Sequence, residues 1–188
     1  MTERAAPDDA DPVVRDIGPA DLDWLLALNN LAVPHVNQLD RRSLADILQL
    51  ATYARCVGRG GRPAGALIGL PPGTAYASDN YRWFDRHHAD FLYIDRVMID
   101  ATSRKGGLGR LLYADFERFA EACGARHLAC EVNSLPPNPI SLRFHQSLGF
   151  GAVAELANAE RSKCVVLMMK PVTGGEAKAT RSSRRELG

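Results

Sequence analysis

One stretch decides the fold of this chain, and it reads Asp95-Arg96-Val97-Met98-Ile99-Asp100-Ala101-Thr102-Ser103-Arg104-Lys105-Gly106-Gly107-Leu108-Gly109-Arg110-Leu111-Leu112. It begins inside an apolar, β-prone run that extends from Phe91 to Ile99. After a short polar loop, apolar residues recur at helical spacing, at Leu108, Leu111, Leu112, Phe116, Phe119 and Ala120. The stretch therefore predicts a strand, a glycine-rich turn and a helix.

The turn has the features of a site for a phosphate or pyrophosphate. Glycine lacks a Cβ, so the backbone can adopt positive φ and approach a ligand closely. The first N–H groups of a helix have no intrahelical acceptor, and the helix dipole favours an anion there. Basic residues and glycines share the turn, at Arg104, Lys105, Gly106, Gly107, Gly109 and Arg110. Taken alone, the same residues are equally consistent with an ordinary tight connection.

Two familiar phosphate motifs do not fit this turn. A P-loop needs Lys followed by Ser or Thr after its last glycine, but Gly109 is followed by Arg110 and Leu111. A dinucleotide fingerprint needs a third small residue where Leu112 stands. An enzyme that uses the turn for a nucleotide phosphate is therefore the weakest interpretation.

The pattern Arg104-x-x-Gly107-x-Gly109 after an apolar strand resembles the acyl-CoA signature of the GNAT N-acetyltransferase superfamily. Downstream, Asn138-x-x-Ser141-x-x-Phe144-His145-x-x-x-Gly149-Phe150 resembles that family's second signature. The family usually has Ala at the place of Ser141 and Tyr at the place of His145. The ordered pair of motifs is more specific than either alone, and the resemblance covers roughly Val13 to Lys170.

The resemblance implies an α/β (α+β) fold with a mixed, mostly antiparallel sheet of about six to seven strands flanked by helices. It implies an acetyl-CoA-dependent N-acetyltransferase that acylates a primary amine by direct transfer in a ternary complex. In this family the first strand of the motif splays from its neighbour, which frees main-chain groups for the pantetheine arm and for the developing oxyanion. The implied cofactor-binding residues are Val97, Met98, Ile99, Arg104, Lys105, Gly106, Gly107, Leu108, Gly109, Arg110, Asn138, Ser141 and Phe144.

The acceptor amine must lose a proton, because an ammonium group has no lone pair with which to attack. Glu131 and Asp95 are carboxylates within otherwise apolar strands, and burial would raise the pKa of either toward the useful range. The alternative for each is a structural ion pair, for instance with Arg96, Arg126 or His127. Proton transfer through water to solvent is a further alternative.

The departing thiolate would benefit from a proton donor, and His145 stands where the family usually has a Tyr. Imidazole titrates near neutrality, so the role is chemically sound. A helix histidine that packs beside the cofactor without a catalytic role is the alternative.

Residues Pro71 to Asp90 show no clean period and are predicted to form a long loop, which in a compact domain is typically functional or disordered. Its aromatic residues argue against disorder. We expect residues 76–88 to form a lid or wall over the acceptor, with Tyr81, Trp83 and Phe84 as substrate-binding residues. The alternative is that Trp83 and Phe84 only fix the loop to the core.

Composition limits the partners. Lys and Arg number 23 and Asp and Glu 22, so a net charge of +1 gives no general attraction to nucleic acid or to an anionic membrane. No apolar run is long enough to cross a bilayer and no secretory signal is visible, so a cytoplasmic protein is expected. The four cysteines form no CxxC pair, and adjacent His87 and His88 would point apart, so no metal site is expected.

We expect one catalytic domain over residues 13–171, between a tail at residues 1–12 and a basic tail at residues 172–188. Strands are predicted at 13–17, 53–57, 64–70, 91–99, 126–132, 151–156 and 164–170, and helices from 22, over 40–51, from 108 and over 139–148. The acceptor is either a small-molecule amine or a protein or peptide amine, and the resemblance is compatible with a homodimer. A catalytically weak CoA-binding regulatory or interaction protein is the alternative function.

Overall fold

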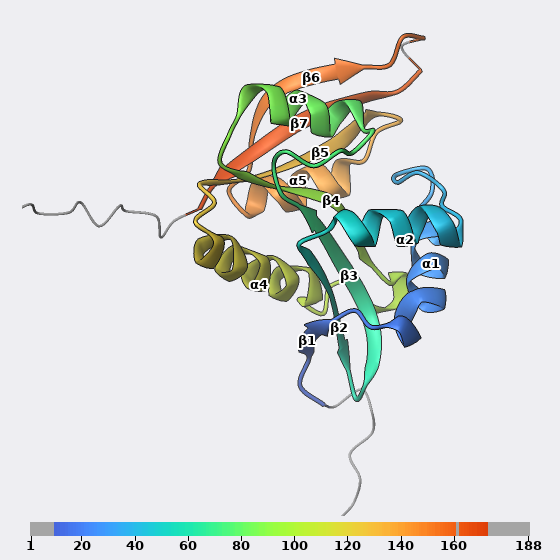
Figure 1. The fold of residues 1–188 in the computed structure, drawn as a ribbon. Helices are drawn as coiled ribbons and strands as arrows, with labels where there is room; N and C mark the ends of the chain where they lie inside the picture. Colours follow the sequence, from blue (N-terminus) through green and yellow to red (C-terminus); the bar gives the residue numbers. More distant parts are fainter. Residues whose placement is uncertain (1–9, 161, 173–188) are drawn as a thin grey trace, which may run out of the picture.

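The computed structural model of the chain describes residues 10–160 and 162–172. In this part, seven strands form one sheet in the order β1-β2-β3-β4-β5-β7-β6 (Figure 1). The strands are β1 (Val13–Asp16), β2 (Tyr53–Arg59), β3 (Arg62–Leu70), β4 (Phe91–Ile99), β5 (His127–Leu135), β6 (Gly151–Ala157) and β7 (Cys164–Pro171). Among these seven strands of the described part, only β4 and β5 pair in parallel. The expected mixed, mostly antiparallel sheet is confirmed.

Helices cover both faces of the sheet. They are α1 (Leu22–Leu31), α2 (Arg41–Leu50), α3 (Asp79–His87), α4 (Leu108–Cys123) and α5 (Pro139–Ser147), with short 3-10 turns at Pro19–Asp21 and Ala101–Ser103. Side chains of α4 and α5 pack with Leu67 of β3, whereas those of α1 and α2 pack with its neighbours Ala66 and Ile68. Because alternate residues of a strand point to opposite faces, α4 and α5 lie on one face and α1 and α2 on the other.

The sheet opens between its two parallel strands. β4 and β5 pair only through Phe91 with His127, Leu92 with Leu128 and Tyr93 with Ala129. Beyond that point β4 stays paired with β3 as far as Ile99, and β5 stays paired with β7 as far as Leu135. The facing edges of β4 and β5 therefore separate, as the resemblance predicts, and their main-chain groups are not used in a ladder between them.

The predicted strands and helices are confirmed, with boundaries that differ by a few residues. The turn between β2 and β3 is tighter than the expected loop from Gly58 to Pro63, because only Gly60 and Gly61, both at positive φ, separate the two strands. β5 runs to Leu135, three residues beyond its predicted end at Val132.

The prediction of a continuous loop from Pro71 to Asp90 is wrong, because α3 lies within it. The Ser78 side chain caps this helix by accepting a hydrogen bond from the Tyr81 N–H. In α3 only Tyr81 and Phe84 are buried, so the apolar stripe is too short to give a clear helical period.

The two predicted tails lie almost entirely outside the described residues. Where the described part begins, the Ala10 carbonyl accepts a hydrogen bond from Arg59, and where it ends the Val172 N–H donates to the Arg126 carbonyl. In residues 10–160 and 162–172, no helix has the length and apolarity needed to cross a bilayer.

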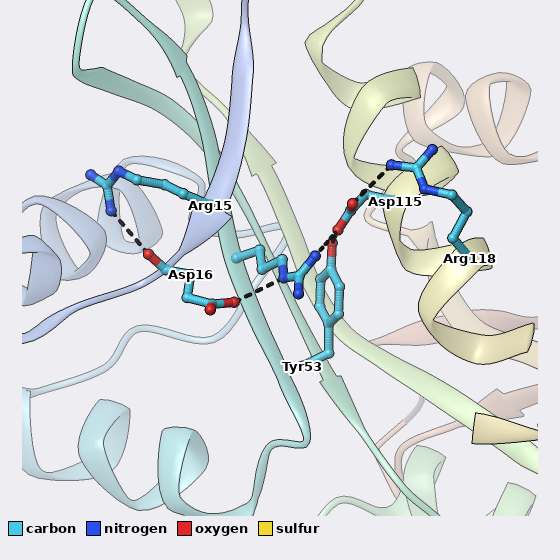
Figure 2. Close-up of polar contacts among 6 residues, drawn as sticks. Arg15, Asp16, Tyr53, Asp115 and Arg118 are labelled. Atoms are coloured by element: carbon cyan, nitrogen blue, oxygen red, sulfur yellow. Dashed lines mark hydrogen bonds and ion pairs between the residues drawn. The ribbon is translucent and has the colours of Figure 1, made fainter. Parts of the chain in front are cut away.

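A charged network fixes α4 to the sheet (Figure 2). The Asp115 carboxylate of α4 accepts hydrogen bonds from Tyr53 Oη at 2.8 Å, Arg55 Nη1 at 2.6 Å and Arg118 Nη2 at 2.9 Å. Arg55 of β2 also pairs with the exposed Asp16 carboxylate of β1 at 2.9 Å. Burial raises the pKa of Asp115, but the three donors outweigh it and hold that pKa below its ordinary value.

We expect Asp115→Ala to lower the free energy of unfolding by about 2 kcal/mol at pH 7, because it leaves the Tyr53 hydroxyl without its acceptor. The carboxylate stabilises the fold above its unfolded pKa of about 4, and this contribution is lost as the pH falls through the lower folded pKa. The difference between variant and wild type should therefore shrink in acid. Urea unfolding at several pH values measures it.

Asp16→Ala is the matched control, because it removes a carboxylate from the same Arg55 but that carboxylate is 83% exposed. Its cost should stay below about 0.5 kcal/mol. Equal losses in the two variants would contradict the role assigned to Asp115.

Candidate active site

A cleft of about 1810 Å³ lies where β4 and β5 separate. Its floor comes from residues 94–99 of β4 and 130–133 of β5. One end is lined by residues 100–105 and 107–110 and by α5, and the other by residues of the 31–39 loop, α2, the 75–86 segment and the ends of β6 and β7. The cleft therefore joins the glycine-rich turn to the predicted acceptor wall.

The glycine-rich turn presents unpaired donors at the start of α4. Lys105 and Gly107 adopt positive φ, of 71° and 78°, and Gly107 is the N-cap of α4. Within the described chain, no hydrogen bond is found from the N–H of Lys105 or of residues 107–110. These N–H groups, the helix dipole and the exposed basic side chains of Arg104 and Lys105 make this end of the cleft suitable for a phosphate.

Gly109 is needed for packing instead of for its φ. A Cβ at this position would lie 3.0 Å from Cζ of Phe144, so the absent side chain lets α5 pack closely on the first turn of α4. The Asn138 side chain caps α5 by accepting from the Ser141 N–H at 3.2 Å.

All the predicted cofactor-binding residues except Gly106 line the cleft: Val97, Met98, Ile99, Arg104, Lys105, Gly107, Leu108, Gly109, Arg110, Asn138, Ser141 and Phe144.

Glu131 lies at the fork of the two strands with one oxygen already bound. Tyr93 Oη donates to Glu131 Oε2 at 2.5 Å, and the residue lines the cleft. Burial raises the pKa of Glu131, the Tyr93 and Asn80 side chains lower it, the charge of Asp95 raises it, and the result is a pKa of about 7. A carboxylate with this pKa exchanges a proton readily near neutral pH.

Asp95 lies nearby but has both oxygens occupied. It is the extra residue of a bulge in β4, since Ile94 pairs with Gly69 and Arg96 with Ile68. Tyr76 Oη donates to Oδ1 at 2.6 Å and Arg96 Nε donates to Oδ2 at 2.5 Å. The Asp95 and Arg96 side chains are only 4% and 5% exposed.

The buried pair continues into α1, because Arg96 Nη1 donates to Oδ1 of fully buried Asn29 at 2.6 Å. This geometry matches the alternative of a structural ion pair between Asp95 and Arg96.

His145 also lines the cleft, yet both of its ring nitrogens have protein partners. Nδ1 lies 2.8 Å from the Ser141 carbonyl, which can only accept, so Nδ1 carries the proton. Nε2 then accepts from Tyr113 Oη at 2.6 Å. Burial lowers the pKa of His145, so the ring is neutral. The arrangement favours a histidine that packs α5 against α4 over a proton donor aimed into the cleft.

The acceptor wall is firmly attached to the sheet. Tyr81 Oη donates to the Pro71 carbonyl at 2.6 Å and accepts from the Thr74 N–H at 2.8 Å, and Tyr76 is bonded to Asp95 as described above. Tyr81 and Phe84 have no exposed surface, so their rings are not available to a substrate. Trp83 is partly exposed, lines the cleft and stacks on His87 with ring centroids 4.3 Å apart.

The loop after α1 lines the same end of the cleft as residues 75–86. Asn133 Nδ2 of β5 lies 3.4 Å and 3.5 Å from the carbonyl oxygens of Pro34 and His35. Lys163 Nζ reaches Asn37 Oδ1 at 3.2 Å. These contacts connect the α1–α2 loop to β5 and to the residue that precedes β7.

Sequence reasoning missed three polar residues of the site, namely Asn29, Tyr93 and Asn133. It placed Tyr76 and Asn80 in the acceptor wall without predicting their contacts with Asp95 and Glu131. Tyr93 lies in an apolar strand and looks like a core residue, and the partner of its hydroxyl depends on the register between β4 and β5. Asn29 and Asn80 lie in helices whose position against the sheet is not visible from local pattern. The described residues contain no group of three or more His, Cys, Asp or Glu side chains arranged for a metal ion.

The sequence matches the family described as "Acetyltransferase (GNAT) family" over residues 27–150. No curated protein sequence matches the chain significantly.

Several solved structures share the fold. The ribosomal-protein-S18-alanine N-acetyltransferase from Escherichia coli has a TM-score of 0.67 and 16% identity, over 86% of this chain and 94% of that one. NAA60 from Arabidopsis thaliana, in complex with a bisubstrate analogue, has a TM-score of 0.70 and 15% identity, over 87% and 99%. The putative acetyltransferase yncA from Salmonella typhimurium, with its cofactor acetyl-CoA, has a TM-score of 0.64 and 20% identity, over 92% and 99%.

We expect Arg96→Met to lower the free energy of unfolding by about 3 kcal/mol, because it leaves the Asp95 charge buried without its cation. The double variant Asp95→Asn/Arg96→Met removes both charges and should recover most of this loss. Urea unfolding at pH 7 measures both variants. A double variant no more stable than Arg96→Met would contradict the ion-pair assignment.

Proposed function

The chain belongs to the acetyltransferase (GNAT) family and is by that membership an acyltransferase, and from this premise we propose that it moves an acetyl group from acetyl-CoA to a primary amine by direct transfer in a ternary complex. One observation carries the proposal. The cleft between β4 and β5 has unpaired N–H donors and basic side chains at one end and a carboxylate of pKa about 7 at its floor.

The residues present fit the chemistry of the donor. The pyrophosphate would bind the N–H groups of Lys105 and of residues 107–110, with Arg104 and Lys105 supplying charge. The pantetheine arm, which carries amides, would pair with the free edge of β4, whose main-chain groups β5 does not use beyond Tyr93. A β4 N–H on that edge would stabilise the charge that develops on the thioester oxygen.

Glu131 serves as the general base in this proposal. It would take one proton from the acceptor ammonium, so that the amine nitrogen could attack the thioester carbon. As the bond from carbon to sulfur breaks, the nitrogen would lose its second proton through water to the departing sulfur, which leaves as the thiol. Glu131 suits the role because its donor Tyr93 is neutral, whereas Asp95 is bound by Arg96. We assign His145 to packing, since its one N–H is held by the Ser141 carbonyl.

The acceptor enters from the side of Trp83, Tyr76 and the α1–α2 loop. Either a small-molecule amine or a protein or peptide amine would meet Glu131 from there, and a screen of amines by thiol release separates the two classes. The cytoplasmic location and the absence of nucleic-acid or membrane partners stay predictions from the sequence.

We expect acetyl-CoA to bind the wild-type protein with micromolar affinity, and Gly107→Glu to weaken binding by at least about tenfold, because its carboxylate would repel the phosphates. Isothermal titration calorimetry measures both.

Gly61→Glu is the matched control for this test. Gly61 has a similar φ of 80° and open space around it, but it lies in the β2–β3 turn outside the cleft. Both variants carry the same backbone strain, so equal loss of binding in the two would contradict the proposed phosphate site.

We expect Glu131→Gln to keep acetyl-CoA affinity but to lower kcat by about 100-fold or more, because the general base is lost. In the wild type, kcat/KM should rise with pH through about 7, since the base must be deprotonated. Thiol release with the best amine of the screen measures both effects. If Glu131→Gln kept full kcat and the same pH profile, another group or solvent would be the base.

A further inference from the structure

Tyr93 joins the two strands at the point where their ladder ends. The last parallel pair is Tyr93 with Ala129, and Glu131 follows Ala129 by two residues, so the side chains of Tyr93 and Glu131 lie on the same face. The 2.5 Å hydrogen bond from Tyr93 Oη to Glu131 Oε2 bridges the opening there. Tyr93 is only 1% exposed, so the hydroxyl reaches Glu131 from inside the core.

We propose that Tyr93 is a positioning residue, which holds Oε2 of Glu131 so that Oε1 faces the acceptor amine. The inference rests on the proposed role of Glu131 as the base. A glutamate that borders an open cleft has several rotamers available, and proton transfer needs the carboxylate within hydrogen-bond reach of the amine. A fixed donor to one oxygen selects the rotamer before the acceptor binds.

The ring of Tyr93 is itself held by α3. Tyr81 lies edge-on to it with centroids 5.3 Å apart, and the Phe84 centroid lies 5.9 Å away. Tyr81 and Phe84 are fully buried in the same cluster as Tyr93. The sequence suggested Tyr81 and Phe84 as substrate contacts. In the structure they instead pack against the ring of Tyr93, whose hydroxyl holds Glu131.

The groups around Glu131 set its pKa, so the loss of the Tyr93 hydroxyl should change that pKa by a measurable amount. Tyr93 and Asp95 face it from β4, Asn80 faces it from α3, and Cys130 precedes it on β5. Burial, with the Glu131 charge, raises the pKa of Tyr93 far above 10, so Tyr93 stays protonated and remains a donor. Because this donor stabilises the charged carboxylate, its loss must raise the pKa of Glu131 further.

Carbon-13 NMR of protein labelled at glutamate side-chain carboxyls tests this without any acceptor. The Glu131 signal is the one missing in Glu131→Gln, and its midpoint in the wild type should lie at about 7. In Tyr93→Phe, which keeps the ring, the midpoint should move up by about one pH unit. With an amine from the screen as acceptor, the acidic limb of the pH profile of kcat/KM should also lie about one pH unit higher in Tyr93→Phe than in the wild type.

Tyr53→Phe is the matched control, since Tyr53 is also a buried tyrosine that donates to a carboxylate, Asp115, but it lies outside the cleft. It should leave the Glu131 midpoint and the acidic limb unchanged. An unchanged midpoint in Tyr93→Phe, or an equal shift in Tyr53→Phe, would overturn the positioning role. If the Glu131 midpoint moved as expected in Tyr93→Phe but Glu131→Gln stayed fully active, the result would support the hydrogen bond from Tyr93 to Glu131. It would contradict the role of Glu131 as the general base.

Discussion

The early end of the ladder between β4 and β5 is the constraint on which the site depends. Parallel strands inside a sheet normally bond along their shared length, and unpaired buried main-chain groups are costly. Here the two strands pair at three positions and then follow different neighbours, β3 and β7. The free edges border a cleft, where water or a ligand can satisfy them. The opening thus supplies the donors that an acyl carrier requires.

The same opening separates two carboxylates into different environments. Asp95 is saturated by Arg96 and Tyr76, whereas Glu131 is partly buried at the cleft and receives a neutral hydroxyl. Burial without a cation raises the pKa of Glu131 to about 7. When two acidic groups lie close together in unlike surroundings, their chemical roles diverge, and the group with the raised pKa is the one suited to proton transfer.

Much of this could be predicted from local signals. Three local signals predict three elements to within a few residues. The apolar run that ends at Ile99 predicts β4, the glycines before Leu108 predict the start of α4, and Asn138-Pro139 predicts the start of α5. The remaining features of the site depend on how the strands and helices lie against one another, which no local sequence pattern shows. A tyrosine such as Tyr93 gives no local sign that its hydroxyl reaches another strand. Tyr81 and Phe84 looked like a substrate surface because a nine-residue helix with two buried residues has too little periodicity to reveal which side faces the core.

The most direct test of the central claim is backbone amide hydrogen exchange with and without acetyl-CoA. If the opening between β4 and β5 holds the acyl donor, protection should increase in residues 94–99 of β4 and 105–110 at the start of α4. The paired strands β1 and β2 should show no change. Added protection that is absent from these two segments, or that appears only elsewhere, would contradict the account.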